Sequence, residues 1–275
     1  MAELVFLKLG GSLITDKTQV EAARPDVLAR LAEEVQQARL ADPGLRLVLG
    51  HGSGSFGHVA ARRYDTRSGV RDPKGWYGFA QVADAAARLD RLVVRAFLEA
   101  GAPVWSIQPS AGARCRDGKI VGWDVGTFRA ALARGLVPMT YGDAVLDEQM
   151  GGTIASTEEL FAWLTQELRP ARIVLAGTVD GIYTRDPLVD PTAQHWAVFT
   201  PADLPQLGAG LGGSHGVDVT GGMLSKVSEM CRLVAAHPGL QVRIVSGLRP
   251  GAVQVALLDG TAGGGTVIQR KMTKL

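Results

Sequence analysis

Several apolar runs of this chain end directly in glycine. Residues 4–9 (LVFLKL) lead into Gly10-Gly11, residues 45–50 (LRLVLG) lead into HGSGSFGH at 51–58, and the runs at 136–141 and 171–177 also end in glycine-rich turns. Helical patterns separate these runs, so the sequence predicts an α/β fold whose mostly parallel sheet is covered on both faces. Ligands bind such sheets at the carboxyl ends of the strands, and we expect one crevice there, lined by the glycines at 10–11, 52–57, 142, 151–152, 177 and 181.

The spacing of apolar residues predicts the other elements. Helices are expected over 25–40, 77–99, 127–134 and 156–168, and another from near Gly221; Ser156 and Glu159 have capping-box spacing. Further strands are expected over 102–108, 242–247 and 266–269, and a hairpin over 114–123 that turns at Asp117-Gly118. The segments after Gly57, between the strand at 136–141 and Ser156, and over 180–216 are expected to be rich in turns.

Composition limits the classes of function. The 275 residues suit one large domain or two lobes around a common sheet, and the 29 basic and 27 acidic residues are well mixed, with a net charge of +2. This balance gives no argument for a nucleic-acid or membrane partner. Cys115 and Cys231 match no metal spacing and predict reduced thiols in a cytoplasmic protein. The first residues lack the pattern of a signal peptide, and no apolar run reaches 18 residues.

The stretch HGSGSFGH satisfies G-x-G-x-x-G through Gly52, Gly54 and Gly57. A nicotinamide or flavin site needs a second strand about 20 residues further on that ends in an acid. The residues that follow are polar, with no apolar strand before Asp65 or Asp72, and the motif does not lie in the first βα unit. The sequence therefore disfavours a dehydrogenase.

A phosphate site explains the same glycines better. Glycines allow backbone N–H groups to converge on an anion at a helix N-terminus. The first strand ends in the same way, in Gly10-Gly11-Ser12, with Lys8 just before and Lys17 just after. Two glycine loops with cationic neighbours predict two phosphate groups that face each other. That is the geometry of phosphoryl transfer from a nucleotide to a phosphorylated or carboxylated acceptor.

Four motifs carry a family resemblance. LKLGGSLITDK (7–17), LGHGSGSFGH (49–58), AGTVDGIYTRDP (176–187) and GVDVTGGMLSK (216–226) occur in an order that resembles the amino acid kinase superfamily. The SFGH and DVTGGM forms most resemble its isopentenyl phosphate kinases. The resemblance implies a three-layer αβα sandwich with an acceptor-binding lobe at about 1–168 and an ATP-binding lobe at about 169–275. It also implies ATP-dependent phosphoryl transfer to isopentenyl phosphate, giving isopentenyl diphosphate for isoprenoid synthesis, with Mg²⁺ and a homodimer.

The resemblance assigns roles to individual residues. Lys8, Lys17 and His58 are implied to be catalytic, with His58 donating to the acceptor phosphate rather than acting as a base, because a phosphate monoester is already largely dianionic at neutral pH. The residues implied to bind the acceptor are Ser53, Gly54, Gly57, His58 and Thr157. Those implied to bind ATP are Lys8, Gly10, Gly11, Ser12, Gly54, Thr178, Asp180, Gly181, Gly222 and Lys226. No carboxylate ligand is assigned to Mg²⁺, since relatives hold it through phosphates and water.

Some positions keep two interpretations. IASTEEL stands where the family usually reads ISGDD, so that Thr157 replaces glycine and Glu158-Glu159 replace two aspartates. This segment either binds the acceptor phosphate or is only a capping box. His51 either orients its loop or has a structural role. Lys226 either binds ATP or pairs with Glu229 on the helix surface.

An apolar pocket for the prenyl tail is expected near Trp76, Tyr77, Phe79 and Val82, which equally suit the core. Two functional alternatives accompany the kinase hypothesis. A kinase of the same fold could act on a phosphonate or an amino-acid carboxylate. A nucleotide-binding storage or regulatory protein could have kept the fold without turnover.

Overall fold

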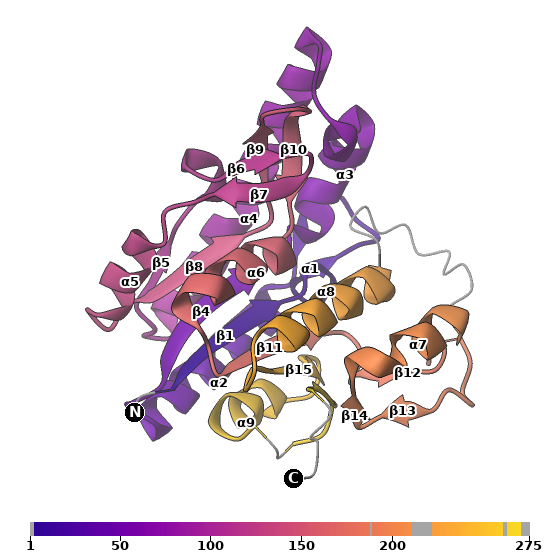
Figure 1. Ribbon diagram of the computed structural model, residues 1–275. Helices are drawn as coiled ribbons and strands as arrows, with labels where there is room; N and C mark the ends of the chain where they lie inside the picture. Colours follow the sequence, from indigo (N-terminus) through magenta and orange to yellow (C-terminus); the bar gives the residue numbers. More distant parts are fainter. Residues whose placement is uncertain (1–2, 188, 211–221, 261–262, 271–275) are drawn as a thin grey trace.

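An eight-stranded sheet forms the middle layer of the protein (Figure 1). The computed structural model describes residues 3–187, 189–210, 222–260 and 263–270. The strand order is β14-β16-β15-β11-β1-β4-β8-β5, and every neighbouring pair is parallel except β15 and β16. The strands are β1 (Leu4–Leu9), β4 (Arg46–His51), β5 (Val104–Ser106), β8 (Val137–Tyr141), β11 (Arg172–Gly177), β14 (Val198–Phe199), β15 (Gln241–Ser246) and β16 (Thr266–Ile268). The predicted, mostly parallel sheet is confirmed.

Helices cover both faces of this sheet, because its strands are apolar on both sides. On β1, Val5 and Leu7 belong to one core, whereas Phe6 belongs to the other and packs against Phe161 with ring centroids 5.1 Å apart. The first core lies under α2 (Pro25–Ala41), α4 (Pro73–Glu99) and α9 (Ala252–Leu258), and the second lies under α5 (Gly126–Leu132), α6 (Thr157–Leu168) and α8 (Gly222–Ala236). The three-layer αβα sandwich is therefore confirmed.

A smaller sheet, in the order β10-β9-β6-β7, lies beside α4 at the upper end of the view in Figure 1. Its strands are β6 (Arg114–Arg116), β7 (Lys119–Gly122), β9 (Asp143–Asp147) and β10 (Gly151–Ala155). The hairpin that turns at Asp117-Gly118 is confirmed, and both turn residues have positive φ angles, 50° and 72°. The expectation of turns before Ser156 was wrong, since β9 and β10 pair as antiparallel strands. The Asp147 carboxylate satisfies four backbone N–H groups around the two turns, which explains an aspartate inside a strand.

The segment after Gly57 was also expected to be turn-like and is instead part of the helix α3 (Gly54–Tyr64). This helix packs closely on α4, where a Cβ on Gly78 would approach the Tyr64 ring to 2.2 Å. Tertiary packing thus stabilises a helix that has few apolar residues of its own. The helix α4 begins at Pro73, before the expected residue 77, because Asp72 caps it by accepting the Gly75 N–H at 2.7 Å.

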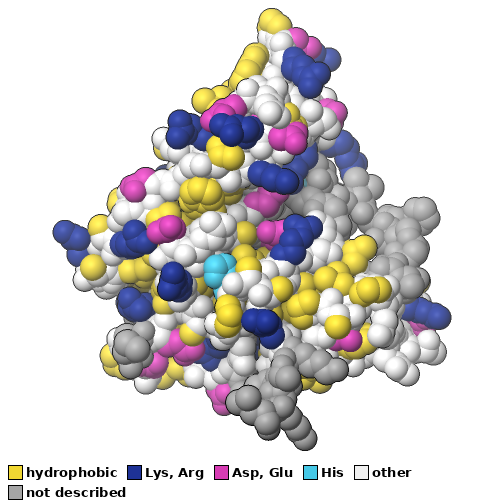
Figure 2. Space-filling model, in the orientation of Figure 1, with side chains coloured by type: hydrophobic (Ala, Val, Ile, Leu, Met, Phe, Trp, Pro, Cys, Tyr) yellow, Lys and Arg dark blue, Asp and Glu magenta, His cyan; other side chains and the backbone are white. Residues whose placement is uncertain are grey.

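The remaining elements are short. The hairpin β2 (Thr15–Asp16) and β3 (Ala22–Ala23) follows α1 (Gly11–Ile14), and the region 180–210 holds β12 (Ile182–Tyr183), β13 (His195–Trp196) and α7 (Leu204–Gly210). The expected helix start near Gly221 and residues 218–221 of DVTGGM lie outside the described residues, and α8 is described from Gly222. None of the described helices has the length and apolar run needed to cross a membrane. Figure 2 shows basic and acidic side chains interspersed over one face of the molecule, in line with the mixed charge of the sequence.

Candidate active site

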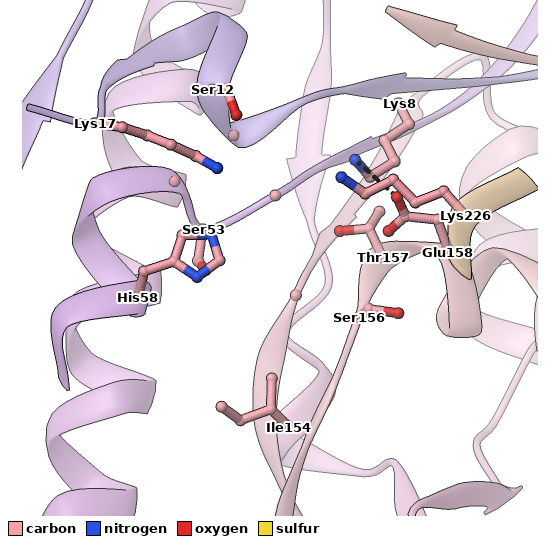
Figure 3. A pocket seen from close by; sticks show the side chains of 14 residues that line it. Lys8, Ser12, Lys17, Ser53, His58, Ile154, Ser156, Thr157, Glu158 and Lys226 are labelled. Atoms are coloured by element: carbon pink, nitrogen blue, oxygen red, sulfur yellow. Dashed lines mark ion pairs between the residues drawn. The ribbon is translucent and has the colours of Figure 1, made fainter. Parts of the chain in front are cut away.

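A cleft opens at the carboxyl ends of β1, β4 and β8 and encloses about 460 Å³ of empty space, part of it open to solvent (Figure 3). The chain passes from β1 to β4 on one side and returns to β11 on the other side of β1, which places the cleft where ligands bind in doubly wound sheets. The lining residues are Lys8, Gly11, Ser12, Lys17, Gly52, Ser53, Gly54, His58, Gly142, Ile154, Ser156, Thr157, Glu158 and Lys226. Most of the residues implied by the resemblance are therefore brought together.

The two predicted glycine loops touch each other through their backbones. A Cβ on Gly11 would lie 2.5 Å from the Gly54 nitrogen, and a Cβ on Gly52 would lie 2.9 Å from the Gly11 nitrogen. Gly54 also has a φ of 51°, and a Cβ there would collide with Thr15. Glycine is required at these positions because the loops could not otherwise approach so closely.

Backbone donors line the cleft on both loops. The first N–H groups of a helix have no partner within that helix. This applies to α1, α3 and α6, whose N-termini all meet here. Within the described parts of the chain, no acceptor is found for the N–H groups of Gly11, Ser12, Ser53, Gly54 and Thr157. Such a group of donors suits oxyanions such as phosphate.

A charged cluster of Lys8, Lys226 and Glu158, here called the lysine cluster, lies on one side of the cleft. Lys8 Nζ is 3.2 Å from Glu158 Oε1, and both side chains are only 8% exposed. Burial by itself would raise the pKa of Glu158, but the charges of Lys8 and Lys226 outweigh it and hold that pKa below its ordinary value. The carboxylate is therefore ionised; it pairs with Lys8 of β1 and attracts the charge of Lys226 on α8.

His58 and Lys17 approach the cleft from the opposite side (Figure 3). His58 lies one turn into α3, beside Ser53, and Lys17 follows the strand β2 and points into the gap between Ser12 and His58. The gap between these side chains and the lysine cluster is bordered by the two glycine loops. Cationic or donor groups thus face it from both sides, as expected for a site that holds two phosphate groups.

A smaller, more apolar pocket of about 340 Å³ adjoins the cleft and shares Ser53, His58, Gly142 and Ile154 with it. The described residues that line it are Ser53, Gly57, His58, Ala61, Arg67, Val82, Gly142 and Ile154. Of the four residues expected near a prenyl tail, only Val82 is in this lining. Phe79 and Ile154 pack against the cluster that contains Val82, whereas Trp76 and Tyr77 are exposed.

In the segment IASTEEL the capping box is confirmed, whereas binding of the acceptor phosphate stays a prediction. Ser156 and Glu159 form the capping box: the Glu159 N–H donates to Ser156 Oγ at 3.2 Å and the Ser156 N–H donates to Glu159 Oε2 at 2.6 Å. The same Glu159 pairs with Arg67 at 2.7 Å, so the charge of Arg67 beside the apolar pocket is compensated. Thr157 donates its hydroxyl to the His51 carbonyl at 2.6 Å, so the backbone N–H is its one donor without an acceptor among the described residues.

Some of the predicted residues are not in the lining. Gly10 donates its N–H to the Ala176 carbonyl at 2.8 Å and so positions the first loop. Thr178, Asp180 and Gly181 follow β11 at the same edge of the sheet, next to β15, where Asp180 Oδ1 accepts the Ser246 N–H at 3.3 Å. Gly222 is the first residue of α8, the helix that carries Lys226 into the cleft. The glycine pair 151–152 begins β10 and does not border the cleft, contrary to expectation.

Glu158, Ile154 and Gly142 line the cleft, but the sequence did not predict a binding or catalytic role for them. Gly142 was expected only to border the crevice. Glu158 occupies the second position of α6, where an acid normally serves the helix dipole and faces water. Only the fold shows that it contacts Lys8. Ile154 was missed because its strand, β10, was not expected.

The described residues contain no cluster of three or more side chains suited to hold a metal ion. Glu158 is the one carboxylate in the described lining of the cleft, and Lys8 is its partner. The site therefore fits a Mg²⁺ ion that is carried by phosphate oxygens and water rather than by protein carboxylates.

Known proteins resemble this chain over almost its whole length. The sequence model of the Amino acid kinase family matches residues 3–246. The isopentenyl phosphate kinase of Methanothermobacter thermautotrophicus is 36% identical over 262 residues, which cover 93% of this chain and 95% of that protein. The isopentenyl phosphate kinase of Haloferax volcanii is 37% identical over 258 residues, 91% of this chain and 98% of that protein.

The fold agrees with these matches. A solved structure described as "X-ray structures of isopentenyl phosphate kinase" superposes with a TM-score of 0.81 at 33% identity, covering 96% of this chain and 100% of that chain. The family match, the relatives above 30% identity and the meeting of the motif residues in one cleft point the same way. This chain belongs to the amino acid kinase family.

Proposed function

We propose that this protein transfers the γ-phosphoryl group of ATP to isopentenyl phosphate, giving isopentenyl diphosphate and ADP. The observation that carries the proposal is the position of His58, which borders both the donor-lined cleft and the adjoining apolar pocket. An acceptor with an anionic head and a short apolar tail fits that pair of spaces. The names of the relatives from Methanothermobacter thermautotrophicus and Haloferax volcanii support the same acceptor.

The acceptor phosphate is held at the α3 side of the cleft. The N–H groups of Ser53, Gly54 and Thr157 and the His58 ring donate to its oxygens, and Gly57 keeps α3 close to the loop because a Cβ there would collide with the Ser53 side chain. The tail enters the pocket that Ala61, Val82 and Ile154 line. The acceptor oxygen needs no base, because a monoester phosphate has a second pKa of about 6.

ATP is held at the opposite side, in the proposed lobe of about 169–275, with the acceptor in the lobe of about 1–168. Gly10, Gly11 and Ser12 with Lys226 hold its phosphates, and Gly222 starts the helix that delivers Lys226. Thr178, Asp180 and Gly181 lie further along the same edge and hold the base and ribose. Mg²⁺ bound to the ATP phosphates would neutralise part of their charge.

Transfer then proceeds in line across the gap between the glycine loops. An acceptor phosphate oxygen forms a bond to the γ-phosphorus as the bond from that phosphorus to the bridging oxygen of ADP breaks. Lys8 and Lys17 stabilise the charge that spreads over the equatorial oxygens in the transition state. Glu158 holds Lys8 and Lys226 in place, so that these charges need little reorganisation. A homodimer and a cytoplasmic location are the accompanying expectations from the resemblance.

The test is an assay of ADP release with Mg-ATP and isopentenyl phosphate, compared with a small phosphonate and with glutamate. We expect the highest kcat/KM for isopentenyl phosphate, and a His58→Asn variant to lose about 10- to 100-fold in kcat/KM, the range for one hydrogen bond lost to a charged group. A His237→Asn variant, at the far end of α8, is the matched control and keeps full activity. Turnover with glutamate that survives His58→Asn would show that the acceptor is a carboxylate, and ATP binding without transfer to any acceptor would show a storage or regulatory protein.

A further inference from the structure

His51 is a buried histidine that no step of the proposed transfer uses. It ends β4 immediately before the second glycine loop, and its side chain is fully buried. The ring stacks on Tyr141, with centroids 5.3 Å apart and planes 14° apart. Its Nε2 lies 3.4 Å from Asp90 Oδ1 on α4, and its Nδ1 lies 3.2 Å from the Gly52 carbonyl oxygen.

Both ring nitrogens of His51 therefore face oxygen atoms. The Gly52 carbonyl can only accept a hydrogen bond, so Nδ1 must carry a proton for this buried contact to be favourable. On the other side of the ring, Nε2 faces the carboxyl group of Asp90, so an oxygen atom lies beside each ring nitrogen. The second Asp90 oxygen accepts from Ser106 Oγ at 2.8 Å, and the Arg91 guanidinium is 4.0 Å away.

The contact with Gly52 fixes the direction of a peptide group. The peptide between Gly52 and Ser53 is trans, as are all the described peptide bonds, and in a trans peptide the C=O and N–H bonds point in opposite directions. A carbonyl that is turned inward to His51 therefore turns the Ser53 N–H outward. Ser53 lines the cleft, and its N–H has no acceptor within the described residues.

We propose that His51 is a positioning residue: its Nδ1–H holds the Gly52 carbonyl in the core and thereby aims the Ser53 N–H at the acceptor phosphate. The inference rests on the proposed role of the cleft as a phosphate site, but not on the identity of the acceptor. The His51 carbonyl adds to this arrangement, because it accepts from the Gly142 N–H at 3.2 Å and from Thr157 Oγ1 at 2.6 Å. His51 thus contacts three segments that line the cleft, at Gly52, Gly142 and Thr157.

The first test uses the unmodified protein. Nitrogen NMR of the histidine rings should show a proton on Nδ1 of His51, and the Ser53 amide resonance should shift strongly on titration with inorganic phosphate. Neither readout depends on turnover, so they separate this proposal from the proposed function. An unprotonated Nδ1, or a Ser53 amide that ignores phosphate while other cleft amides respond, overturns it.

The second test compares two variants in the same buried network. His51→Phe keeps a ring that can stack on Tyr141 but removes the Nδ1 donor. We expect the KM for the acceptor to rise about 10- to 100-fold, the range for one lost donor to a charged group, with a smaller change in the KM for ATP. Ser106→Ala removes the hydrogen bond from Ser106 Oγ to Asp90 but leaves the contact between His51 and Gly52 in place. It should change the KM for the acceptor less than twofold. His51→Gln, whose amide can donate to Gly52, should restore part of the affinity. An unchanged acceptor KM in His51→Phe contradicts the proposal.

Discussion

The lysine cluster brings two positive charges and one negative charge together; Lys8 and Glu158 are only 8% exposed, whereas Lys226 is half-buried. Removing one partner of a buried ion pair leaves the other uncompensated, which is costly. In the free protein Glu158 is the negative partner, and in the proposed complex the phosphates of ATP supply further negative charge. The Glu158 carboxylate therefore compensates the lysines before ATP binds, and it competes with the phosphates for them afterwards.

We predict that Glu158→Gln lowers the free energy of unfolding of the free protein by about 3 kcal/mol, the lower end for breaking a buried ion pair. The variant should bind ATP more tightly, because its lysines lack their carboxylate, while kcat falls because they are no longer held in place. By linkage, the loss of stability should shrink at saturating ATP. Thermal unfolding with and without ATP, together with calorimetry, measures both effects. The control is Glu167→Gln, because Glu167 lies on the same helix as Glu158 but forms an exposed pair with Arg129 of α5. Equal ATP affinity in Glu158→Gln and the unmodified protein would contradict the prediction.

Two aspartates at the ends of β9 show how an element sets the charge of its residues. Burial raises the pKa of Asp143 to about 6, against the hydrogen bonds from Ser110 and Ala144. Burial also acts to raise the pKa of Asp147, but its four backbone donors outweigh it, and that pKa lies below the ordinary value. The same strand therefore contains two carboxyl groups with opposite effects on stability as pH changes.

The raised pKa of Asp143 determines how this residue changes the stability of the protein with pH. Its contribution to stability is full below the ordinary pKa of 3.8 and is lost as pH rises through about 6. A shift of this size corresponds to about 3 kcal/mol. We therefore predict that raising the pH from 4 to 7 increases the free energy of unfolding of Asp143→Asn, relative to the unmodified protein, by about that amount. Urea unfolding at both pH values measures it, and Asp147→Asn is the matched control, because the contribution of Asp147 is present above pH 4 and is lost at lower pH.

Elements with a regular apolar period could be predicted from the sequence, and those that depend on partners could not. The strands β1, β4, β11 and β15 carry apolar residues towards both cores, so each is visible as a short apolar run. The strand β9 was hidden because aspartates usually mark turns, and only the fold supplies the donors that satisfy Asp147. The helix α3 was hidden because its stability comes from α4. The glycine loops and lysines of the cleft could be predicted from motifs, but the contact of Glu158 with Lys8 joins residues 150 positions apart and leaves no local signal.

At the scale of the whole molecule, the two proposed lobes share one sheet and both cores. β1 pairs in parallel with β4 on one side and with β11 on the other. Each core contains residues from both sides of position 168: Leu7 packs in one core with Val174, and Phe6 packs in the other with Val227. Buried polar contacts cross the same boundary, since Glu34 on α2 accepts the Val253 N–H of α9 at 3.0 Å.

Neither lobe can therefore unfold without exposing the apolar side chains and the backbone ladder of β1. We predict a single cooperative transition in urea, reported alike from both lobes. Two variants test this, one that keeps only Trp163 on α6 and one that keeps only Trp196 on β13, with the other four tryptophans of each changed to Phe. Fluorescence midpoints of the two variants should each coincide with the midpoint from circular dichroism of the same variant. A Trp196 midpoint well below that of the circular dichroism signal would instead show that the lobe at about 169–275 opens first, which the shared β1 ladder argues against.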